Sequence, residues 1–306
     1  MAPTSTPHTA ERSGDAAPAV DAFSTRPNEI TMVPTRLGPL KVEMCGSGPP
    51  AVLWHSLFVD STTWERVREP LSAVRRLILI DGPSHGGSPG PGRTFTLDEC
   101  AGAAADVLTH LGVDGPVDWV GNAWGGHVGL LFAVASPDRV RSLITIGTPV
   151  QALSSAERPK ITALVTLYRL TGPIRPLVKT VTNALLGRSS AVANPENARL
   201  VGDALRRAKR RGLYLAMRSV MLNRADSTDA LTSLTIPTMF VKGAHDPVWT
   251  VEQIQSSASL VPGVVCEVVP GGGHVAPLLD GASDLVELTT AFWAESIRKA
   301  TQPAAV

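Results

Sequence analysis

Residues 117–129 read VDWVGNAWGGHVG and have the layout of a reactive turn. An apolar strand leads into a sharp turn, and a helix opens at Trp124. In the motif G-x-S-x-G, such a turn holds a nucleophile between two glycines, because the strained backbone leaves no room for neighbouring side chains. The central position here is Ala123, so the motif predicts a nucleophile site without its reactive side chain. His127, one helical turn later, is expected to pack the helix rather than to react.

Two later loops carry groups that could activate a nucleophile at position 123. Asp246 follows a strand expected at residues 238–241, and His274 follows one expected at residues 264–269, so the order along the chain is nucleophile, acid, base. A hydroxyl becomes an effective nucleophile when an imidazole accepts its proton, and a carboxylate fixes the tautomer of that imidazole. We therefore expect Asp246 to orient His274.

A third loop follows another buried strand and reads His55-Ser56-Leu57-Phe58. An oxyanion that develops during attack on a carbonyl needs two N–H donors, and loss of one such donor typically lowers the rate by about 10²–10³. The backbone N–H groups of Leu57 and Trp124 are the natural pair. We also expect His55, Ser56 and Phe58 to contact a substrate.

The elements that must position these loops alternate between strand-like and helix-like patterns. This alternation covers residues 28–149 and 234–300, and it predicts an α/β fold with a mostly parallel, doubly wound sheet. The expected strands are residues 30–35, 40–44, 51–54, 76–81, 117–120, 141–147, 238–241 and 264–269. The expected core helices are residues 61–73, 96–111, 125–135, 250–258 and 283–297.

Between these two parts, residues 150–233 show only helical patterns, at 160–170, 174–186, 195–210 and 213–222. We interpret this segment as an inserted cap over the carboxyl edge of the sheet, where ligands bind in such folds. Tyr168 and Tyr214 in the cap, and Trp249 beside the acid loop, are further candidates for substrate contact. The cap holds fourteen Lys or Arg against five Asp or Glu, so the substrate is expected to be apolar or anionic.

Composition limits the remaining classes of function. The formal net charge of +1 gives no reason to expect nucleic-acid or membrane binding. Three cysteines without C-x-x-C spacing indicate neither a disulfide framework nor a metal site. Residues 1–27 are rich in Ala, Pro, Ser and Thr and are expected to be a disordered tail, as are residues 301–306. With no signal-peptide layout, a cytoplasmic location is expected, and the sequence is compatible with a homodimer.

Taken together, these motifs resemble the α/β-hydrolase fold superfamily over about residues 28–298. The resemblance is carried by His55-Ser56, Asp81-Gly82-Pro83-Ser84-His85-Gly86-Gly87-Ser88, Gly121-Asn122-Ala123-Trp124-Gly125-Gly126, Gly243 to Asp246, and Gly273-His274. It implies Asp246 as the triad acid, His274 as the base, Leu57 and Trp124 as the oxyanion hole, and a cap that shapes substrate choice. It implies no metal and no organic cofactor. The departures are Ala123, Ser56 in place of a glycine and Ser84 in place of a glycine.

Three interpretations of Ala123 follow from this resemblance. In the first, the parent protein has serine here and hydrolyses a small-molecule carboxylic ester or lactone through an acyl-enzyme, and this chain is an inactive variant that still binds substrate. The presence of Asp246 and His274 favours this interpretation. In another, alanine is native, and the protein binds a ligand or uses His274 as a lone general base.

The remaining interpretation gives the parent an aspartate nucleophile, as in haloalkane dehalogenases and epoxide hydrolases. Trp124 resembles the tryptophan beside the dehalogenase nucleophile, and Tyr168 and Tyr214 lie in the cap, as epoxide-hydrolase tyrosines do. Leu57 argues against it, because a dehalogenase has a halide-binding asparagine at that position.

Overall fold

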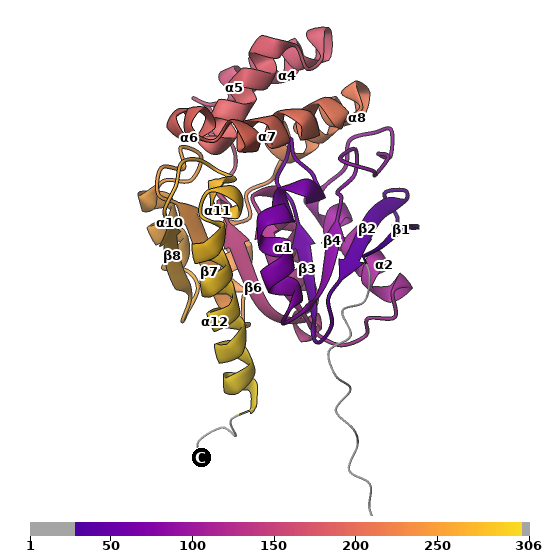
Figure 1. Cartoon of the computed structure of the whole chain (residues 1–306), viewed down its shortest axis with the longest axis vertical. Coiled ribbons are helices and arrows are strands. Elements are labelled where there is room, and N and C mark those ends of the chain that lie inside the picture. The colour runs from indigo at the N-terminus through magenta and orange to yellow at the C-terminus, as the bar shows by residue number, and fades with distance from the viewer. Residues whose placement is uncertain (1–27, 302–306) are drawn as a thin grey trace, which may run out of the picture.

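The computed structural model describes residues 28–301 and contains one eight-stranded sheet (Figure 1). The expected tails lie outside the described residues, except for Thr301, which ends the last helix. The strand order is β1-β2-β4-β3-β5-β6-β7-β8, in which β1 and β2 form a hairpin, β2 pairs antiparallel with β4, and all other pairs are parallel. The strands are β1 Glu29–Val33, β2 Leu40–Cys45, β3 Pro50–Trp54, β4 Arg76–Ile80, β5 Val117–Asn122, β6 Val140–Ile146, β7 Thr238–Gly243 and β8 Val265–Val269.

The central strands are buried on both faces, as their continuous apolar sequences predict. Helices α1 (Glu65–Ser72), α11 (Ala276–Leu279) and α12 (Ala282–Thr301) lie in front of the sheet in Figure 1, and α2 (Leu97–His110) lies behind it. Helix α3 (Trp124–Ala135) packs on β5, β6 and α2. Shorter elements complete the core: η1 Ser61–Trp64, η2 Pro137–Arg139, α9 Thr228–Thr232 and α10 Val251–Ala258. The predicted fold class is confirmed.

The helices between β6 and β7 form a separate group above one edge of the sheet (Figure 1). We call them the helical layer: α4 Arg158–Thr171, α5 Arg175–Leu186, α6 Arg188–Ala193, α7 Pro195–Arg207, α8 Arg210–Met217 and the π-helix η3 Arg218–Leu222. One expected helix, 195–210, ends earlier than predicted because Ala208 and Lys209 have extended backbones, with ψ of 132° and 124°. Like charges one turn apart destabilise a helix, and five of the six residues from 206 to 211 are cationic.

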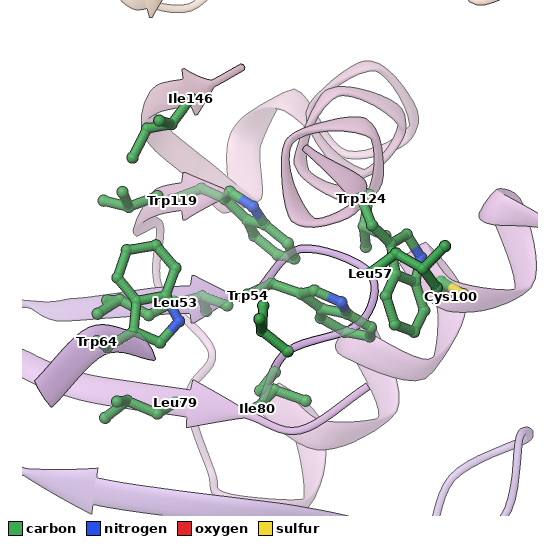
Figure 2. Close-up of a cluster of buried hydrophobic side chains, with 14 of the residues drawn as sticks. Leu53, Trp54, Leu57, Trp64, Leu79, Ile80, Cys100, Trp119, Trp124 and Ile146 are labelled. Carbon is green, nitrogen blue, oxygen red and sulfur yellow. The ribbon is translucent and has the colours of Figure 1, made fainter. Parts of the chain in front are cut away.

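Tryptophans fill the core beneath the reactive turn (Figure 2). Trp54 of β3 stacks on Trp119 of β5, with ring centroids 6.4 Å apart, and meets Trp124 edge-on at 5.7 Å. The indole Nε1 of Trp119 donates to the carbonyl of Gly125 at 3.0 Å. These contacts join strand β5 to the first turn of α3, so the turn between them is rigidly supported. Among the described residues, no helix is long and apolar enough to cross a bilayer.

Candidate active site

The turn between β5 and α3 has the strained geometry of a nucleophile elbow. Ala123 has φ 48° and ψ −99°, a backbone conformation that residues other than glycine rarely adopt. A Cβ on Gly121 would lie 2.2 Å from the carbonyl carbon of Gly125, and a Cβ on Gly125 would lie 1.9 Å from the carbonyl oxygen of Trp54. Both glycines are therefore required by the close approach of backbone to backbone. The Ala123 N–H donates to the Ile146 carbonyl at 2.7 Å, which holds the turn in place.

The structure brings together the predicted acid and base. His274 Nδ1 lies 3.0 Å from Asp246 Oδ2, and both residues are buried. Burial alone would raise the pKa of the Asp246 carboxyl, but His274 and the Val248 N–H, which donates to Oδ1 at 2.8 Å, hold that pKa below its usual value. The carboxylate is therefore ionised at neutral pH. Because it accepts the Nδ1 proton, Nε2 is left as the nitrogen that can take a proton from a nucleophile.

Asn122 and Gly147 tie this pair to the elbow, and neither was identified from the sequence. Asn122 Nδ2 donates to the His274 carbonyl at 3.1 Å and to the Ile146 carbonyl at 3.0 Å. Gly147 has φ +57°, and a Cβ there would lie 2.9 Å from Asp246 Oδ2 and 3.0 Å from His274 Nδ1. Only a residue without a side chain leaves room for the acid–base pair at the end of β6.

The loop that carries His274 is also bonded to the helical layer. The N–H groups on either side of the histidine, those of Gly273 and Val275, donate to the carbonyls of Leu186 at 2.7 Å and Leu185 at 2.8 Å. These carbonyls belong to the last turn of α5, where a helix has no internal partners for them. The helical layer therefore helps to position the base.

Two buried histidines hold the loop expected to form the oxyanion hole. His55 Nε2 accepts from the Gly82 N–H at 2.9 Å, and His85 Nε2 accepts from the Phe58 N–H at 3.3 Å. Burial lowers the pKa of both imidazoles, that of His85 to about 3, so both are neutral supports of the loop. The prediction that His55 contacts substrate is corrected, because its ring is fully buried between two loops. In the described part of the chain, the Leu57 N–H has no hydrogen-bond partner and is available to an oxyanion.

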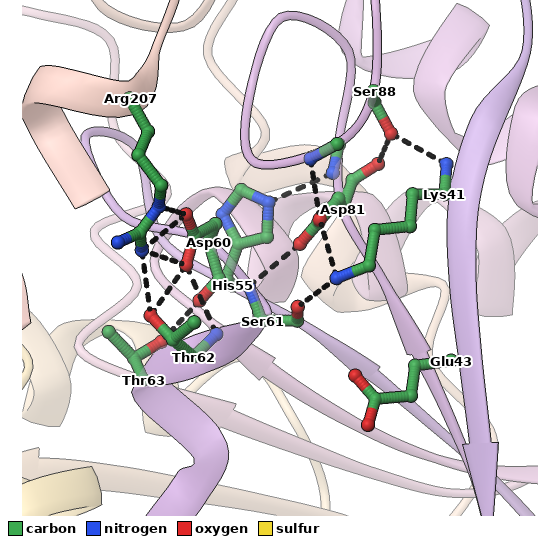
Figure 3. Close-up of polar contacts among 12 residues, drawn as sticks. Lys41, Glu43, His55, Asp60, Ser61, Thr62, Thr63, Asp81, Ser88 and Arg207 are labelled. Atoms are coloured by element: carbon green, nitrogen blue, oxygen red, sulfur yellow. Dashed lines mark hydrogen bonds and ion pairs between the residues drawn. The ribbon is translucent and has the colours of Figure 1, made fainter. Parts of the chain in front are cut away.

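A polar network continues from this loop toward the helical layer (Figure 3). Asp60 is buried, and its carboxylate accepts from Nε and Nη2 of Arg207, at the end of α7, at 3.1 and 2.8 Å. Asp81 accepts from the Ser61 N–H at 2.8 Å and lies 3.3 Å from Lys41 Nζ. The Asp60–Arg207 pair thus joins the loop after β3 to the helical layer. This contact is separate from the one that the His274 loop makes with α5.

A cavity of about 340 Å³ lies between the sheet edge and the helical layer. Six predicted residues line its floor: Ser56, Leu57, Phe58, Ala123, Trp124 and His274. Apolar side chains of the helical layer, together with Thr180, cover it: Ile161, Leu164, Val181, Ala184, Leu185, Val220 and Met221. A largely apolar cleft with a few convergent polar groups is the usual form of a small-molecule site.

Three other residues predicted to contact substrate lie outside the cavity lining, and these assignments are corrected. Tyr168 is fully buried in the packing of the helical layer. The guanidinium carbon of Arg169 lies over the ring of Tyr214, 5.3 Å from the ring centroid. Trp249 is buried against Phe240, with ring centroids 5.7 Å apart. A sequence places such residues on an element but does not fix which face of the element points to the ligand.

Two residues for which the sequence predicted no substrate contact line the same cavity, His127 and Arg224. Burial, followed by the nearby charges of Arg224 and His274, lowers the pKa of His127 well below its usual value. Burial also lowers the pKa of Arg224, to about 10. His127 lies four residues after Ala123, and that helical spacing would have placed it at the elbow. The sequence holds no comparable signal for Arg224, which is one of many cationic residues in its segment.

Comparison with known proteins agrees with this fold. A family model described as alpha/beta hydrolase fold matches residues 49–280. A pimeloyl-[acyl-carrier protein] methyl ester esterase of Chromobacterium violaceum is 26% identical over 253 residues, which cover 81% of this chain and 95% of that protein. A thermophilic esterase from Thermogutta terrifontis superposes with a TM-score of 0.80 at 25% identity, covering 88% of this chain and 99% of that one. An enol-lactonase from Burkholderia xenovorans shares the fold, with a TM-score of 0.76 at 19% identity and coverage of 84% and 96%. The chain therefore belongs to the α/β-hydrolase fold family.

Proposed function

We propose that this chain is the alanine form of a serine hydrolase that cleaves a carboxylic ester or a lactone. The observation that carries the proposal is the buried Asp246–His274 pair, which lies at the same cavity as the left-handed backbone of Ala123. An imidazole oriented by a carboxylate has a clear use beside a serine hydroxyl. Beside a methyl group it has no proton to accept.

In the serine form, each group has one role. The hydroxyl oxygen of residue 123 attacks the carbonyl carbon while His274 Nε2 takes the hydroxyl proton. The N–H groups of Leu57 and Trp124 stabilise the oxyanion, and His274 then gives its proton to the leaving alkoxide. Water, deprotonated by the same imidazole, hydrolyses the acyl-enzyme and releases the acid. Asp246 stays ionised throughout and fixes the imidazole tautomer.

The strained backbone at residue 123 supports the same interpretation. A left-handed conformation at a residue other than glycine costs on the order of 1–3 kcal/mol and persists only where surrounding contacts impose it. The two glycines and the Ala123–Ile146 hydrogen bond impose it here, although the methyl group that Ala123 places in the cavity lining has no reactive atom. The elbow is thus built for a longer side chain at this position.

The alternative with an aspartate nucleophile loses one of its two supports. It rested in part on Tyr168 and Tyr214, which lie outside the cavity lining. A binding protein with a native alanine is distinguished from the disabled hydrolase by restoring the hydroxyl.

The test compares Ala123→Ser with the chain as it stands, on a panel of neutral p-nitrophenyl esters and simple lactones. We expect turnover by the serine variant only, because loss of a triad nucleophile lowers kcat by about 10⁶. The double variant Ala123→Ser/His274→Ala controls for hydrolysis that does not need the base, and it should be inactive. An inactive Ala123→Ser variant that folds normally would refute the proposal and favour a binding role.

A further inference from the structure

Arg224 lines the catalytic cavity and lacks a carboxylate partner. It follows η3 in the chain, and its Nη1 donates to the Pro149 carbonyl at 2.6 Å. Within the described residues, no carboxylate oxygen lies within 4.0 Å of its guanidinium. The guanidinium is thus fixed by a neutral group, and its remaining N–H donors are free to bind a ligand.

Asp226 and Glu157 are the acidic residues whose charges act on Arg224, and both carboxylates accept hydrogen bonds from other groups. The carboxylate of Asp226 accepts from the Ala152 N–H and the Thr228 N–H, each at 2.8 Å. The carboxylate of Glu157 accepts from the N–H of Ser154 at 3.2 Å and from its hydroxyl. Burial lowers the pKa of Arg224 only to about 10, so the group is cationic at neutral pH. Glu157 also lines the cavity, but within the described residues no carboxylate contacts the Arg224 guanidinium, so this cation can still bind a ligand.

His127 adds an unused polar group to the same cavity. Its side chain is 3% exposed, and its Nδ1 is buried without a hydrogen-bond partner among the described residues. A buried polar atom without a partner costs free energy, which a ligand can recover by bonding to it. A neutral imidazole carries one N–H donor and no charge. Arg224 and His127 thus supply a cation and a neutral donor to a largely apolar lining, in which the Glu157 carboxylate is held by Ser154.

We propose that Arg224 and His127 form a binding site for an ionised carboxylate of the substrate, so that the chain prefers esters or lactones that carry a second, free carboxylate. This inference rests on the proposed function, since it assigns the substrate class of that active site. A planar guanidinium matches a carboxylate geometrically, and a partly desolvated site strengthens their attraction. The excess of basic side chains in the helical layer attracts such an anion toward the cavity.

The test uses the alanine chain itself, because it binds without acylating. Calorimetry at neutral pH compares monomethyl glutarate, which has one free carboxylate, with dimethyl glutarate, which has none. We expect the monoester to bind about tenfold to a hundredfold more tightly, the range for a hydrogen bond between charged groups. Arg224→Gln should abolish this preference. Arg224→Lys, which keeps the charge but not the planar fork, should retain part of it.

Arg218→Gln is the matched control, because it removes one exposed positive charge from the neighbouring helix η3. It should leave the preference unchanged. Equal binding of the two esters by the unaltered chain, or an equal loss of preference in Arg218→Gln and Arg224→Gln, would overturn the proposal. If Arg224→Gln binds neither ester, Arg224→Lys decides: a retained preference supports the site, and a lost preference overturns it.

This experiment and the test of the hydrolase proposal fail separately. A carboxylate preference in the alanine chain together with an inactive Ala123→Ser variant would remove only the hydrolytic function. Turnover of neutral esters by Ala123→Ser without a carboxylate preference in the alanine chain would remove only the binding site at Arg224.

Discussion

A methyl group added at Gly147 would test whether the space behind the acid–base pair controls the chemistry. The added Cβ would lie 2.9 Å from Asp246 Oδ2 and 3.0 Å from His274 Nδ1, and carbon atoms do not approach polar atoms this closely without displacement. The backbone beside it is pinned, because the Gly147 N–H donates to the Val241 carbonyl at 2.8 Å. The side chains of Asp246 and His274 must therefore move.

Two separate effects of Gly147→Ala can be given magnitudes. An alanine at φ +57° costs about 1–2 kcal/mol of stability from the left-handed backbone alone. A catalytic group misplaced by about 1 Å can lower the rate by about 10²-fold. We therefore expect Ala123→Ser/Gly147→Ala to lose about 10² in kcat relative to Ala123→Ser, with only a modest loss of stability.

The assay measures kcat on a p-nitrophenyl ester together with unfolding in urea. Gly112→Ala is the matched control, because Gly112 has a similar φ of +64° and no atom within 4 Å of an added Cβ. In Ala123→Ser, the Gly112→Ala change should cause the same loss of stability through backbone strain and leave kcat unchanged. In the alanine chain, proton NMR of the His274 Nδ1–H gives a readout that does not depend on turnover, and Gly147→Ala should shift that resonance.

If Ala123→Ser/Gly147→Ala kept kcat within about twofold of Ala123→Ser while losing the stability expected from its strain, the space behind the pair would not control the chemistry. The result would mean that the pair relaxes without loss of its alignment with residue 123. An equal fall in kcat for Gly112→Ala would lead to the same conclusion, because the effect would then come from general destabilisation.

Three further predictions concern the supports around the site. Asn122→Ala should lower the free energy of unfolding by about 1–3 kcal/mol, because the carbonyls of Ile146 and His274 lose a donor; unchanged stability in urea would contradict this. Burial raises the pKa of Asp60, but Thr62 and Arg207 together hold it below 3.8, so the pair stabilises the fold above that pH and loses its effect as the pH falls through the lower, folded-state value. Arg207→Gln should therefore be destabilised at neutral pH and approach the parent in strong acid, and a pH-independent difference in urea midpoint would refute the linkage. Tyr214→Phe in Ala123→Ser should leave kcat/KM unchanged, because the ring lies against Arg169; a fall of more than about tenfold, the scale of one lost catalytic hydrogen bond, would return Tyr214 to the active site.

The sheet and the order of the loops at its carboxyl edge were predictable because each signal is local. After Arg76, the run 77–80 is apolar throughout, as a strand buried on both faces must be, and it forms most of β4. The loop with Asp246 follows the fully buried strand β7, and the loop with His274 follows β8, the strand at the edge of the sheet. In a parallel sheet the carboxyl ends of strands meet at one edge, so loops far apart in sequence could be placed together.

The residues that line the cavity could not all be predicted, because this depends on how each helix packs and on where along it the cavity lies. Tyr168 and Leu164 lie one turn apart on α4, yet Leu164 lines the cavity and Tyr168 is buried in the helical layer. Arg224 is one of fourteen cationic residues in residues 150–233, and only the packing shows that it lines the cavity and that no described carboxylate contacts it. Gly147 gives no signal either, because its role is to leave space for side chains from two distant loops.

The hydrogen bonds from Gly273 and Val275 to the last turn of α5 limit how freely the inserted helices can be exchanged. A chimera that grafts a foreign insertion onto this sheet would change the cavity lining, but it would also remove the Leu185 and Leu186 carbonyls that hold the backbone around His274. Helix α5 thus both lines the cavity and holds the His274 loop in place. Engineering of new specificities in this scaffold should therefore vary α4 and η3 and keep the carboxyl-terminal turn of α5 intact.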